Sequence, residues 1–320
     1  MIPFGPIPSR RLGRSLGVNN IPPKTCTYSC IYCQIGRTNR KQTHRCAFYD
    51  PLAVFEEVAD KVRLVQRQGE SVDYLTLVPD GEPTLESRLG AQIQLLQTIS
   101  PKVAVITNSS LLGRADVRRD LMKADWVSLK VDATQLGIWC KINRSHPGLY
   151  LRTILDGIVK FAEVFKGQLV TETMLVKDVN DSEDHIRKTA DFLARIEPSK
   201  AYLSIPTRPP AEEWVHPPRE EIINRAYQIL SERVECEYLI GYEGAEFTTT
   251  GNVVADLLST TAVHPMRKDA VEELLAKTGE DWSIIDGLVL QGDIVELEYE
   301  GHTFFMKRLR SRTESPAIAV

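Results

Sequence analysis

Residues 24–36 read KTCTYSCIYCQIG, and this stretch holds three of the six cysteines of the chain, Cys26, Cys30 and Cys33. Spacings of three and two intervening residues let one tight loop direct three thiolates at one compact centre. Thiolates are the usual ligands of iron–sulfur clusters, and a cube of four irons normally takes four of them. Three cysteines would therefore leave one iron open for a ligand from outside the chain, which the spacing alone does not name.

The other cysteines and the histidines leave a zinc site open as an alternative. Zinc sites usually combine two CxxC or Cys/His pairs, and the nearest further ligands, His44 and Cys46, would form an irregular set with the loop. Ligand preference favours an iron–sulfur cluster over zinc or three unrelated thiols. Cys46, Cys140 and Cys236 are far apart in the sequence, so we expect ordinary thiols there and no second cluster.

Composition indicates a globular protein with an uneven charge. The 320 residues are 42% apolar and 26% charged, which supplies ample material for a buried core. No run of about eighteen apolar residues predicts a membrane span, and residues 1–17 lack the apolar stretch of a secretory signal, so we expect a cytoplasmic protein. Residues 1–50 carry eight Lys/Arg against one Asp, or +7, whereas residues 245–320 carry seven Lys/Arg against thirteen Asp/Glu, or −6.

Strand and helix patterns alternate from residue 51 to residue 242. Apolar runs typical of strands buried on both faces occur at residues 72–79, 102–108, 126–132, 168–176, 201–206 and 235–242. Helices are predicted next to them at residues 51–68, 86–99, 114–123, 149–165, 182–196 and 218–232. This alternation is the signature of parallel βαβ units. We therefore predict an α/β fold, a partial (βα)6 TIM-like barrel over residues 1–244, with its functional site at the carboxyl ends of the strands.

Residues 245–312 follow a different pattern. Helices are predicted at 252–261, 268–279 and 282–292, and a hairpin over 293–309 with Glu300-Gly301 at its turn. Three helices and a hairpin are typical of a small winged-helix domain, and residues 313–320 are predicted to be a frayed tail. The third helix contains Asp286 and no Lys or Arg, whereas duplex binding needs a basic footprint. We therefore expect this domain to dock a protein, a peptide or another subunit, or to cover the barrel, although Arg308, Arg310 and Arg312 at its end are basic.

Polar side chains stand at the ends of the predicted strands. Residues 80–83, DGEP, close the first strand, and on the residues alone a tight turn is the simplest interpretation. Residues 107–109, TNS, end the second, where a side-chain oxygen would cap the next helix. Ser128, Lys130 and Asp132 occupy alternate positions of the third and so share one face. Buried polar groups need partners, which an internal salt bridge of Lys130 would supply.

These features resemble the radical SAM superfamily, whose members bind S-adenosylmethionine (SAM). That family carries CxxxCxΦC after its first strand, with an aromatic residue before the last cysteine, and Tyr32 fills that place here. Five segments are similar to the wyosine-formation-related group within the superfamily: FGPIPSRRLGRSLG (4–17), CQIGRT (33–38), SLKVDA (128–133), INRSHP (142–147) and IPTRPP (205–210). The likeness covers residues 1–245.

The resemblance implies a [4Fe–4S] cluster on Cys26, Cys30 and Cys33, whose open iron is chelated by the amino and carboxylate groups of SAM. One electron entering the cluster would cleave the sulfonium, and the resulting 5′-deoxyadenosyl radical would abstract hydrogen from a substrate. Because the sequence has no recognisable flavodoxin-like domain, we expect an external electron donor of the flavodoxin or ferredoxin type.

The resemblance also implies roles for residues at the strand ends. The expected SAM contacts are Tyr32, Gly81, Glu82, Pro83, Asn108, Ser128, Asp132 and Arg144, and the expected catalytic residues are Lys130 and Glu172. A Lys130–Glu172 salt bridge is the alternative for the last two, and surface ion pairs are the alternative for Arg144 and Arg208, which otherwise offer a guanidinium to an anion. Asp80 stands where the family commonly has glycine, so a positive φ at this position would be strained.

The substrate is left open between RNA, a protein or peptide, and a small molecule. The nearest characterised relatives by resemblance build the tricyclic wyosine base on tRNA, and the basic residues 1–50 would suit phosphate contacts; internal pairing of Arg10, Arg11 and Arg14 is the alternative. The acidic accessory domain and the lack of a visible second cluster argue against tRNA. A second hypothesis is an iron–sulfur-containing binding or regulatory protein that acts through its winged helix. SAM motifs at successive strand ends favour the enzyme.

Overall fold

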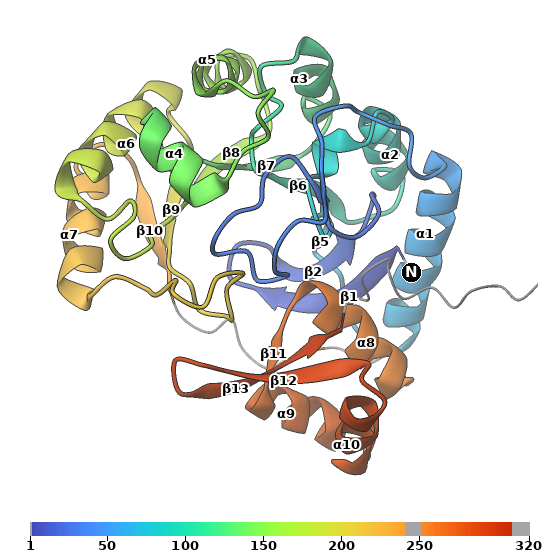
Figure 1. Cartoon of the computed structure of the whole chain (residues 1–320). Helices are drawn as coiled ribbons and strands as arrows, with labels where there is room; N and C mark the ends of the chain where they lie inside the picture. Colours follow the sequence, from blue (N-terminus) through green and yellow to red (C-terminus); the bar gives the residue numbers. More distant parts are fainter. Residues whose placement is uncertain (1, 241–246, 248–250, 309–320) are drawn as a thin grey trace, which may run out of the picture.

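An eight-stranded sheet organises most of the chain. The computed structural model describes residues 2–240, 247 and 251–308. In order across the sheet, the strands are β1 (Pro3–Ser9), β2 (Gly13–Val18), β5 (Tyr74–Leu77), β6 (Lys102–Thr107), β7 (Trp126–Lys130), β8 (Gln168–Met174), β9 (Lys200–Ser204) and β10 (Cys236–Leu239). Neighbours from β2 to β10 are parallel, and β1 is antiparallel to β2. The sheet curls into an open half-barrel (Figure 1).

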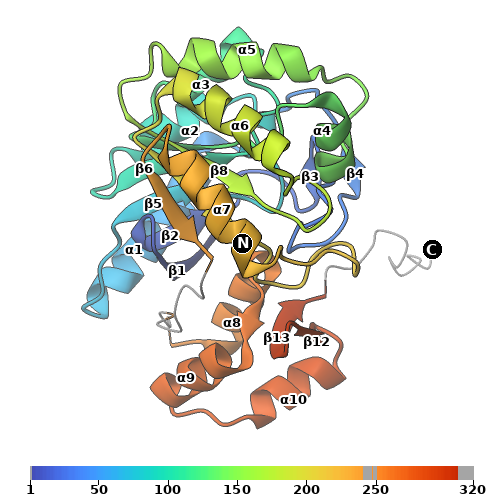
Figure 2. The ribbon, with the colours of Figure 1, turned by 90° about the vertical axis from the view of Figure 1, so that its left-hand side faces the viewer.

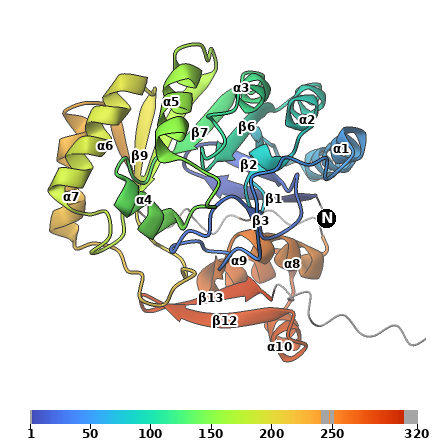
Figure 3. The same ribbon diagram turned by 45° about the horizontal axis from the view of Figure 1, so that its top comes forward.

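Helices cover the outer face of the sheet, as the view in Figure 3 shows. They are α1 (Pro51–Arg67), α2 (Leu89–Leu96), α3 (Ala115–Leu121), α5 (Leu151–Ala162), α6 (Glu183–Ile196) and α7 (Glu220–Ser231). Helix α4 (Leu136–Asn143) lies instead over the open end of the barrel beside the cysteine loop, where its Ile142 carbonyl accepts from Ile31 N–H at 3.0 Å. Side chains alternate between the two faces of a strand. On β7, Val127 and Leu129 therefore join the core beneath the helices, whereas Trp126 packs inside the barrel.

A small apolar cluster fills the amino-terminal end of the barrel interior. Leu12, Ala104, Trp126, Val170 and Tyr202 pack together in it. Nearer the carboxyl ends of β7, β8 and β9, the interior holds the polar side chains of Lys130, Glu172 and Ser204 beside Met174. The fold thus leaves polar side chains at the end of the barrel where the sequence predicts the functional site.

The predicted partial barrel is confirmed, and the structure adds strands that the sequence did not predict. The missed strands β1 and β2 are interrupted by glycine and proline, which weaken the strand pattern. At one of these positions packing favours glycine, because a Cβ on Gly17 would lie 2.1 Å from the ring of Phe4 in the paired strand and would displace it. The sheet therefore has seven parallel strands, β2 included, instead of six. Two short strands, β3 (Thr25–Cys26) and β4 (Arg40–Lys41), form a separate parallel pair.

The carboxyl-terminal unit contains the three predicted helices and the predicted hairpin. Its elements are α8 (Val253–Val263), β11 (Met266–Arg267), α9 (Lys268–Thr278), α10 (Ser283–Leu290), β12 (Ile294–Tyr299) and β13 (His302–Lys307). Glu300 and Gly301 form the hairpin turn, both with positive φ. The winged-helix assignment itself stays a prediction. The predicted boundary at residues 244 and 245 and the predicted tail 313–320 lie outside the described residues.

The carboxyl-terminal unit packs against the first strand of the barrel, as Figure 2 shows. Phe4 and Ile7 of β1 belong to the same apolar cluster as Leu257 of α8. Lys61 of α1 also pairs with Asp256 of α8 at 3.5 Å. Within the part of the chain that the structure describes, no helix is long and apolar enough to cross a membrane.

Candidate active site at the cysteine loop

The three loop cysteines line one cavity. Cys26 lies in β3, and with Cys30 and Cys33 it borders a space of about 180 Å³ that also reaches residues 78–81 after β5. All six cysteines are free thiols. The side chain of Asn108 donates to the sulfur of Cys26 at 3.4 Å. The three thiols thus border the same cavity, as their spacing in the sequence predicts.

The cavity disfavours bare thiolates. Burial raises the pKa of Cys26 and Cys33, and burial and the nearby Asp132 raise the pKa of Cys30 to about 12. A bound iron ion supplies the positive charge that deprotonates a coordinating thiol, so the donor set fits an iron–sulfur cluster. Among the described residues, no group of three or more His, Cys, Asp or Glu side chains is close enough together to hold a single metal ion. A cube differs from such a site because each thiolate binds a separate iron.

The turn at residues 80–83 touches the cysteine loop. Glu82 N–H donates to Thr25 O at 3.1 Å, and a Cβ on Gly81 would lie 1.8 Å from that oxygen. Glycine is therefore needed for close approach. Asp80 has no positive φ, so the strain that its substitution for glycine would cause does not arise. Its carboxylate is buried in the cavity wall with Oδ1 unpartnered, and burial, partly offset by Lys24, raises the pKa of Asp80 to about 7.

Glu82 holds the strand ends together. Its buried carboxylate accepts from the Thr84 hydroxyl at 2.5 Å and the Thr107 hydroxyl at 2.6 Å. It also accepts the backbone N–H of Asn108 at 2.8 Å. Pro83 begins a short 3₁₀ helix (Pro83–Leu85) and its carbonyl accepts from Asn20. These contacts give Glu82 and Pro83 a structural role, and their contact with SAM stays a prediction.

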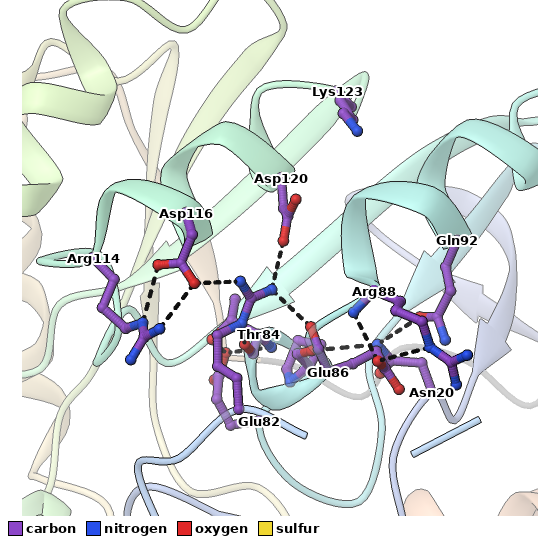
Figure 4. Close-up of polar contacts among 12 residues, drawn as sticks. Asn20, Glu82, Thr84, Glu86, Arg88, Gln92, Arg114, Asp116, Asp120 and Lys123 are labelled. Carbon is purple, nitrogen blue, oxygen red and sulfur yellow. Dashed lines mark hydrogen bonds and ion pairs between the residues drawn. The ribbon is translucent and has the colours of Figure 1, made fainter. Parts of the chain in front are cut away.

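A buried arginine anchors the same turn from outside. Arg45 donates to the carbonyl oxygens of Thr84 at 2.8 Å and Glu86 at 2.7 Å. It also pairs with Asp116 at 2.9 Å and Asp120 at 2.5 Å on α3. Figure 4 shows the partners on both sides, Thr84 and Glu86 after the turn and Asp116 and Asp120 on α3. The segment that follows the cysteine loop is thereby fixed to the turn that lines the cavity.

A second cavity of about 320 Å³ occupies the barrel interior. Lys130 of β7 and Glu172 of β8 are register partners and line it, with their charged atoms 3.1 Å apart. Arg11 reaches the other oxygen of Glu172 at 2.6 Å, and the Ser204 hydroxyl donates to Glu172 at 3.2 Å. The Lys130–Glu172 salt bridge that was left open as an alternative is therefore present. Arg11 is thus paired internally, which was the alternative to a phosphate contact, but the sequence did not predict Glu172 as its partner because the two residues are 161 positions apart.

The charges in the barrel cavity are fixed by their neighbours. Burial alone would raise the pKa of the Glu172 carboxyl, but Lys130 and Arg11 outweigh it and lower this pKa to about 2. Burial would lower the pKa of Lys130, but Glu172 and Asp132 outweigh it and raise that pKa. At neutral pH the cavity wall therefore carries an ammonium, a guanidinium and a carboxylate.

Tyr32 and Asp132 link the cysteine loop to β7. The Tyr32 hydroxyl donates to Asp132, whose carboxylate also accepts from Asn143 at 2.8 Å and from Met174 N–H at 3.0 Å. Lys130 lies 4.6 Å from the centre of the Tyr32 ring. Asp132 is thus occupied by protein donors, and its predicted contact with SAM stays a prediction. Ser128 is fully buried, and its hydroxyl has no protein partner.

The two arginines that the sequence offered for anion binding lie in different places. Arg144 caps α4 and pairs with Glu212, as the surface alternative has it, and it lines neither cavity. Arg208 lines the barrel cavity and donates to Gln34 at 3.1 Å and to His264 at 3.0 Å. Gln34 in turn donates to Val263 O at 2.8 Å. The carboxyl-terminal unit therefore closes part of the cavity, a contribution that no local sequence pattern signals.

The remaining cysteines stand on separate elements. The backbone of Cys46 pairs with that of Glu86 in an isolated β-bridge, Cys140 is exposed on α4, and Cys236 begins β10. That they form no second cluster stays a prediction.

Comparisons with known proteins agree with this geometry. A family model described as the radical SAM superfamily matches residues 20–193. A UPF0026 protein of Methanocaldococcus jannaschii is 44% identical over 317 residues, which are 98% of each chain. A radical SAM methyltransferase from Sphaerobacter thermophilus has a similar fold, with a TM-score of 0.52 and 17% identity over 71% of this chain and 66% of that one. TYW1 with a lysine-pyruvate adduct bound also has a similar fold, with a TM-score of 0.51 and 17% identity over 69% of this chain and 74% of that one. The chain therefore belongs to the radical SAM superfamily, whose enzymes use a [4Fe–4S] cluster and SAM.

Proposed function

We propose that this enzyme cleaves SAM reductively at the cysteine loop and abstracts hydrogen from a substrate held in the barrel cavity. The observation that carries the proposal is the shared wall of the two cavities. Cys33, Gln34, Val78 and Val263 border both of them. When bound, the cluster and SAM supply a 5′-deoxyadenosyl radical, which needs a substrate within direct reach.

The chain's own residues divide into three roles. Cys26, Cys30 and Cys33 would hold the cluster. The unpartnered carboxylate oxygen of Asp80 and the backbone at Gly81 would face the SAM ammonium, since a buried carboxylate is stabilised by a cation. Around the substrate, Lys130 and Glu172 would act as fixed charges. A carboxyl with a pKa near 2 is a poor proton donor or acceptor at neutral pH. The catalytic role proposed for Lys130 and Glu172 is therefore to orient the substrate and not to transfer a proton.

The barrel cavity suits a substrate group of limited size. At about 320 Å³ it is at the small end of ligand pockets, so a small molecule, a single base or a single side chain would fit. Lys130 and Arg11 against Glu172 leave this part of its wall with one positive charge in excess, which favours a group that carries a carboxylate or phosphate. RNA and a peptide both stay candidates for the molecule that presents this group.

Anaerobic reconstitution with iron and sulfide tests the proposal. The protein should show absorbance of a [4Fe–4S] cluster and, with dithionite and SAM, should release 5′-deoxyadenosine and methionine. Cys30→Ser should lose both, because one thiolate ligand is missing. Cys140→Ser is the matched control, since Cys140 is exposed on α4. A wild-type protein that binds the cluster but releases no 5′-deoxyadenosine would contradict the proposed function.

A further inference from the structure

The segment that carries the cysteine loop is basic. Residues 19–49 contain five Lys and Arg and no Asp or Glu. Arg45 is buried in the α3 network, and Lys24 lines the cluster cavity. Three others remain on the surface: the side chain of Arg37 is 70% exposed, and Arg40 and Lys41 are both exposed. We call Arg37, Arg40 and Lys41 the basic edge.

The basic edge lies one strand away from a proposed cluster ligand. In the β3–β4 pair, Lys41 is the register partner of Cys26, and Arg40 is the partner of Thr25. Neighbouring strands are about 4.8 Å apart. Figure 2 shows β3 and β4 side by side at the margin of the barrel, near α4. No residue of the basic edge lines the barrel cavity, so these charges adjoin the electron-accepting side of the site and not its substrate side.

Nearby charges leave the basic edge positive. Glu212 accepts from Arg37 at 2.8 Å and also pairs with Arg144, so one carboxylate faces two guanidinium groups. Lys41 donates to the carbonyl oxygens of Arg144 at 3.1 Å and Ser145 at 3.3 Å at the end of α4, and within the described ranges no carboxylate is paired with it. A surface of one sign raises the association rate of an oppositely charged partner about 10- to 1000-fold.

We propose that the basic edge is the docking surface for an acidic one-electron donor protein of the flavodoxin or ferredoxin type. This inference rests on the proposed function, which needs one electron for each SAM cleaved. The donor is oxidised by one electron, and SAM is reduced as its C5′–S bond breaks. RNA is also anionic, so charge does not separate the two partners; the position of the basic edge, one strand from Cys26 and away from the barrel cavity, favours the electron donor.

The test compares two reductants on the reconstituted full-length protein. Arg40→Glu/Lys41→Glu should lower kcat/KM for a reduced acidic flavodoxin about tenfold or more at low ionic strength. The difference from wild type should shrink at about 0.5 M salt, where the Debye length is only a few Å. The dithionite-driven rate of 5′-deoxyadenosine release should stay within about twofold, because a small reductant needs no docking surface. Arg40→Glu alone leaves the Lys41 contacts intact. It should also lower kcat/KM for flavodoxin without changing the dithionite-driven rate, but by a smaller factor.

A control with the same change in net charge is Lys102→Glu/Lys166→Glu. Both lysines are exposed near the amino ends of β6 and β8, at the other end of the barrel, and their replacement should leave both rates unchanged. Equal losses in this control, or equal losses with flavodoxin and dithionite, would overturn the docking role. An unchanged rate with flavodoxin in Arg40→Glu/Lys41→Glu would also overturn the docking role. This outcome includes a variant that loses RNA binding while its flavodoxin rate is unchanged. Failure of the dithionite reaction in wild type would instead count against the proposed function itself.

Discussion

Asn143 Nδ2 lies 3.4 Å from Cys30 Sγ and 2.8 Å from an Asp132 oxygen, so one side-chain amide joins the cysteine loop to the end of β7. Asn108 makes the corresponding contact with Cys26 at 3.4 Å from the end of β6. A side-chain amide has two N–H groups, so Asn143 satisfies both partners at once. Hydrogen bonds to ligand sulfurs help to set the reduction potential of an iron–sulfur cluster. The end of β6 therefore reaches one proposed cluster ligand directly, and the end of β7 reaches another through Asn143 of α4.

Asn143→Ala should lower the reduction potential of the reconstituted protein. An N–H that points at a thiolate stabilises the reduced form, which carries one more negative charge, so its loss makes reduction harder. We expect the equilibrium constant for reduction to fall by up to about tenfold, or about 59 mV for one electron. A potentiometric titration followed by electron paramagnetic resonance measures it. The exposed Asn224→Ala on α7 should not shift the potential, and an equal potential in Asn143→Ala would contradict the role of this amide.

Gly81→Ala should disrupt the cluster cavity. The new methyl group would lie 1.8 Å from Thr25 O and must displace either the turn or β3, which carries Cys26. Overpacking of this kind costs about 1–3 kcal/mol, and we expect a lower iron content after reconstitution as well as a lower melting temperature. Gly137→Ala is the control, because its Cβ would meet nothing within 4 Å on α4. Normal iron content in Gly81→Ala would show that the close approach is dispensable.

The sequence predicts the features that depend on residues close together in the chain, and it does not predict the contacts between distant residues. The cysteine loop and the apolar strands are periodic or closely spaced, so the sequence predicts them. The Arg11–Glu172 pair joins residues 161 positions apart, and no local pattern contains it. Asn143 lies on α4, which the sequence did not predict as a helix. The contact of His264 with Arg208 depends on how the carboxyl-terminal unit packs against the barrel, which a hydrophobic pattern does not encode.

Glu172→Gln should destabilise the protein in a pH-dependent manner. The pKa of the Glu172 carboxyl falls from its usual 4.5 to about 2 in the folded protein, so the unfolded chain binds this proton more tightly. The resulting stabilisation is fully present above about pH 4.5 and is lost as the pH falls toward about 2. Urea unfolding should show a difference from wild type on the order of 3 kcal/mol at pH 7, because two cations lose a buried partner, and only a small difference near pH 2, where about half of the Glu172 carboxyl is protonated.

Glu183→Gln provides the control for that measurement. Arg225 and Arg187 also lower the pKa of Glu183 to about 2, but its side chain is 49% exposed. Solvent screens such a pair, so its removal should change the free energy of unfolding much less. Equal changes in the free energy of unfolding for the two substitutions would mean that burial does not strengthen the ion pairs of Glu172.

His264→Gln should make the stability of the protein less sensitive to mild acid. Burial and the neighbouring Arg208 hold the pKa of His264 well below its usual 6.5, and its Nε2 lies 3.0 Å from the Arg208 guanidinium. The unfolded chain takes up this proton first, so the folded state loses stability as the pH falls below about 6.5. Glutamine retains an acceptor for Arg208 without titrating. Between pH 6.5 and pH 5.5 the variant should therefore lose about 1 kcal/mol less than wild type in the free energy of unfolding. His185, which is also buried with a lowered pKa, is present in both proteins and cancels, so parallel pH profiles would show that His264 is not held neutral against the barrel.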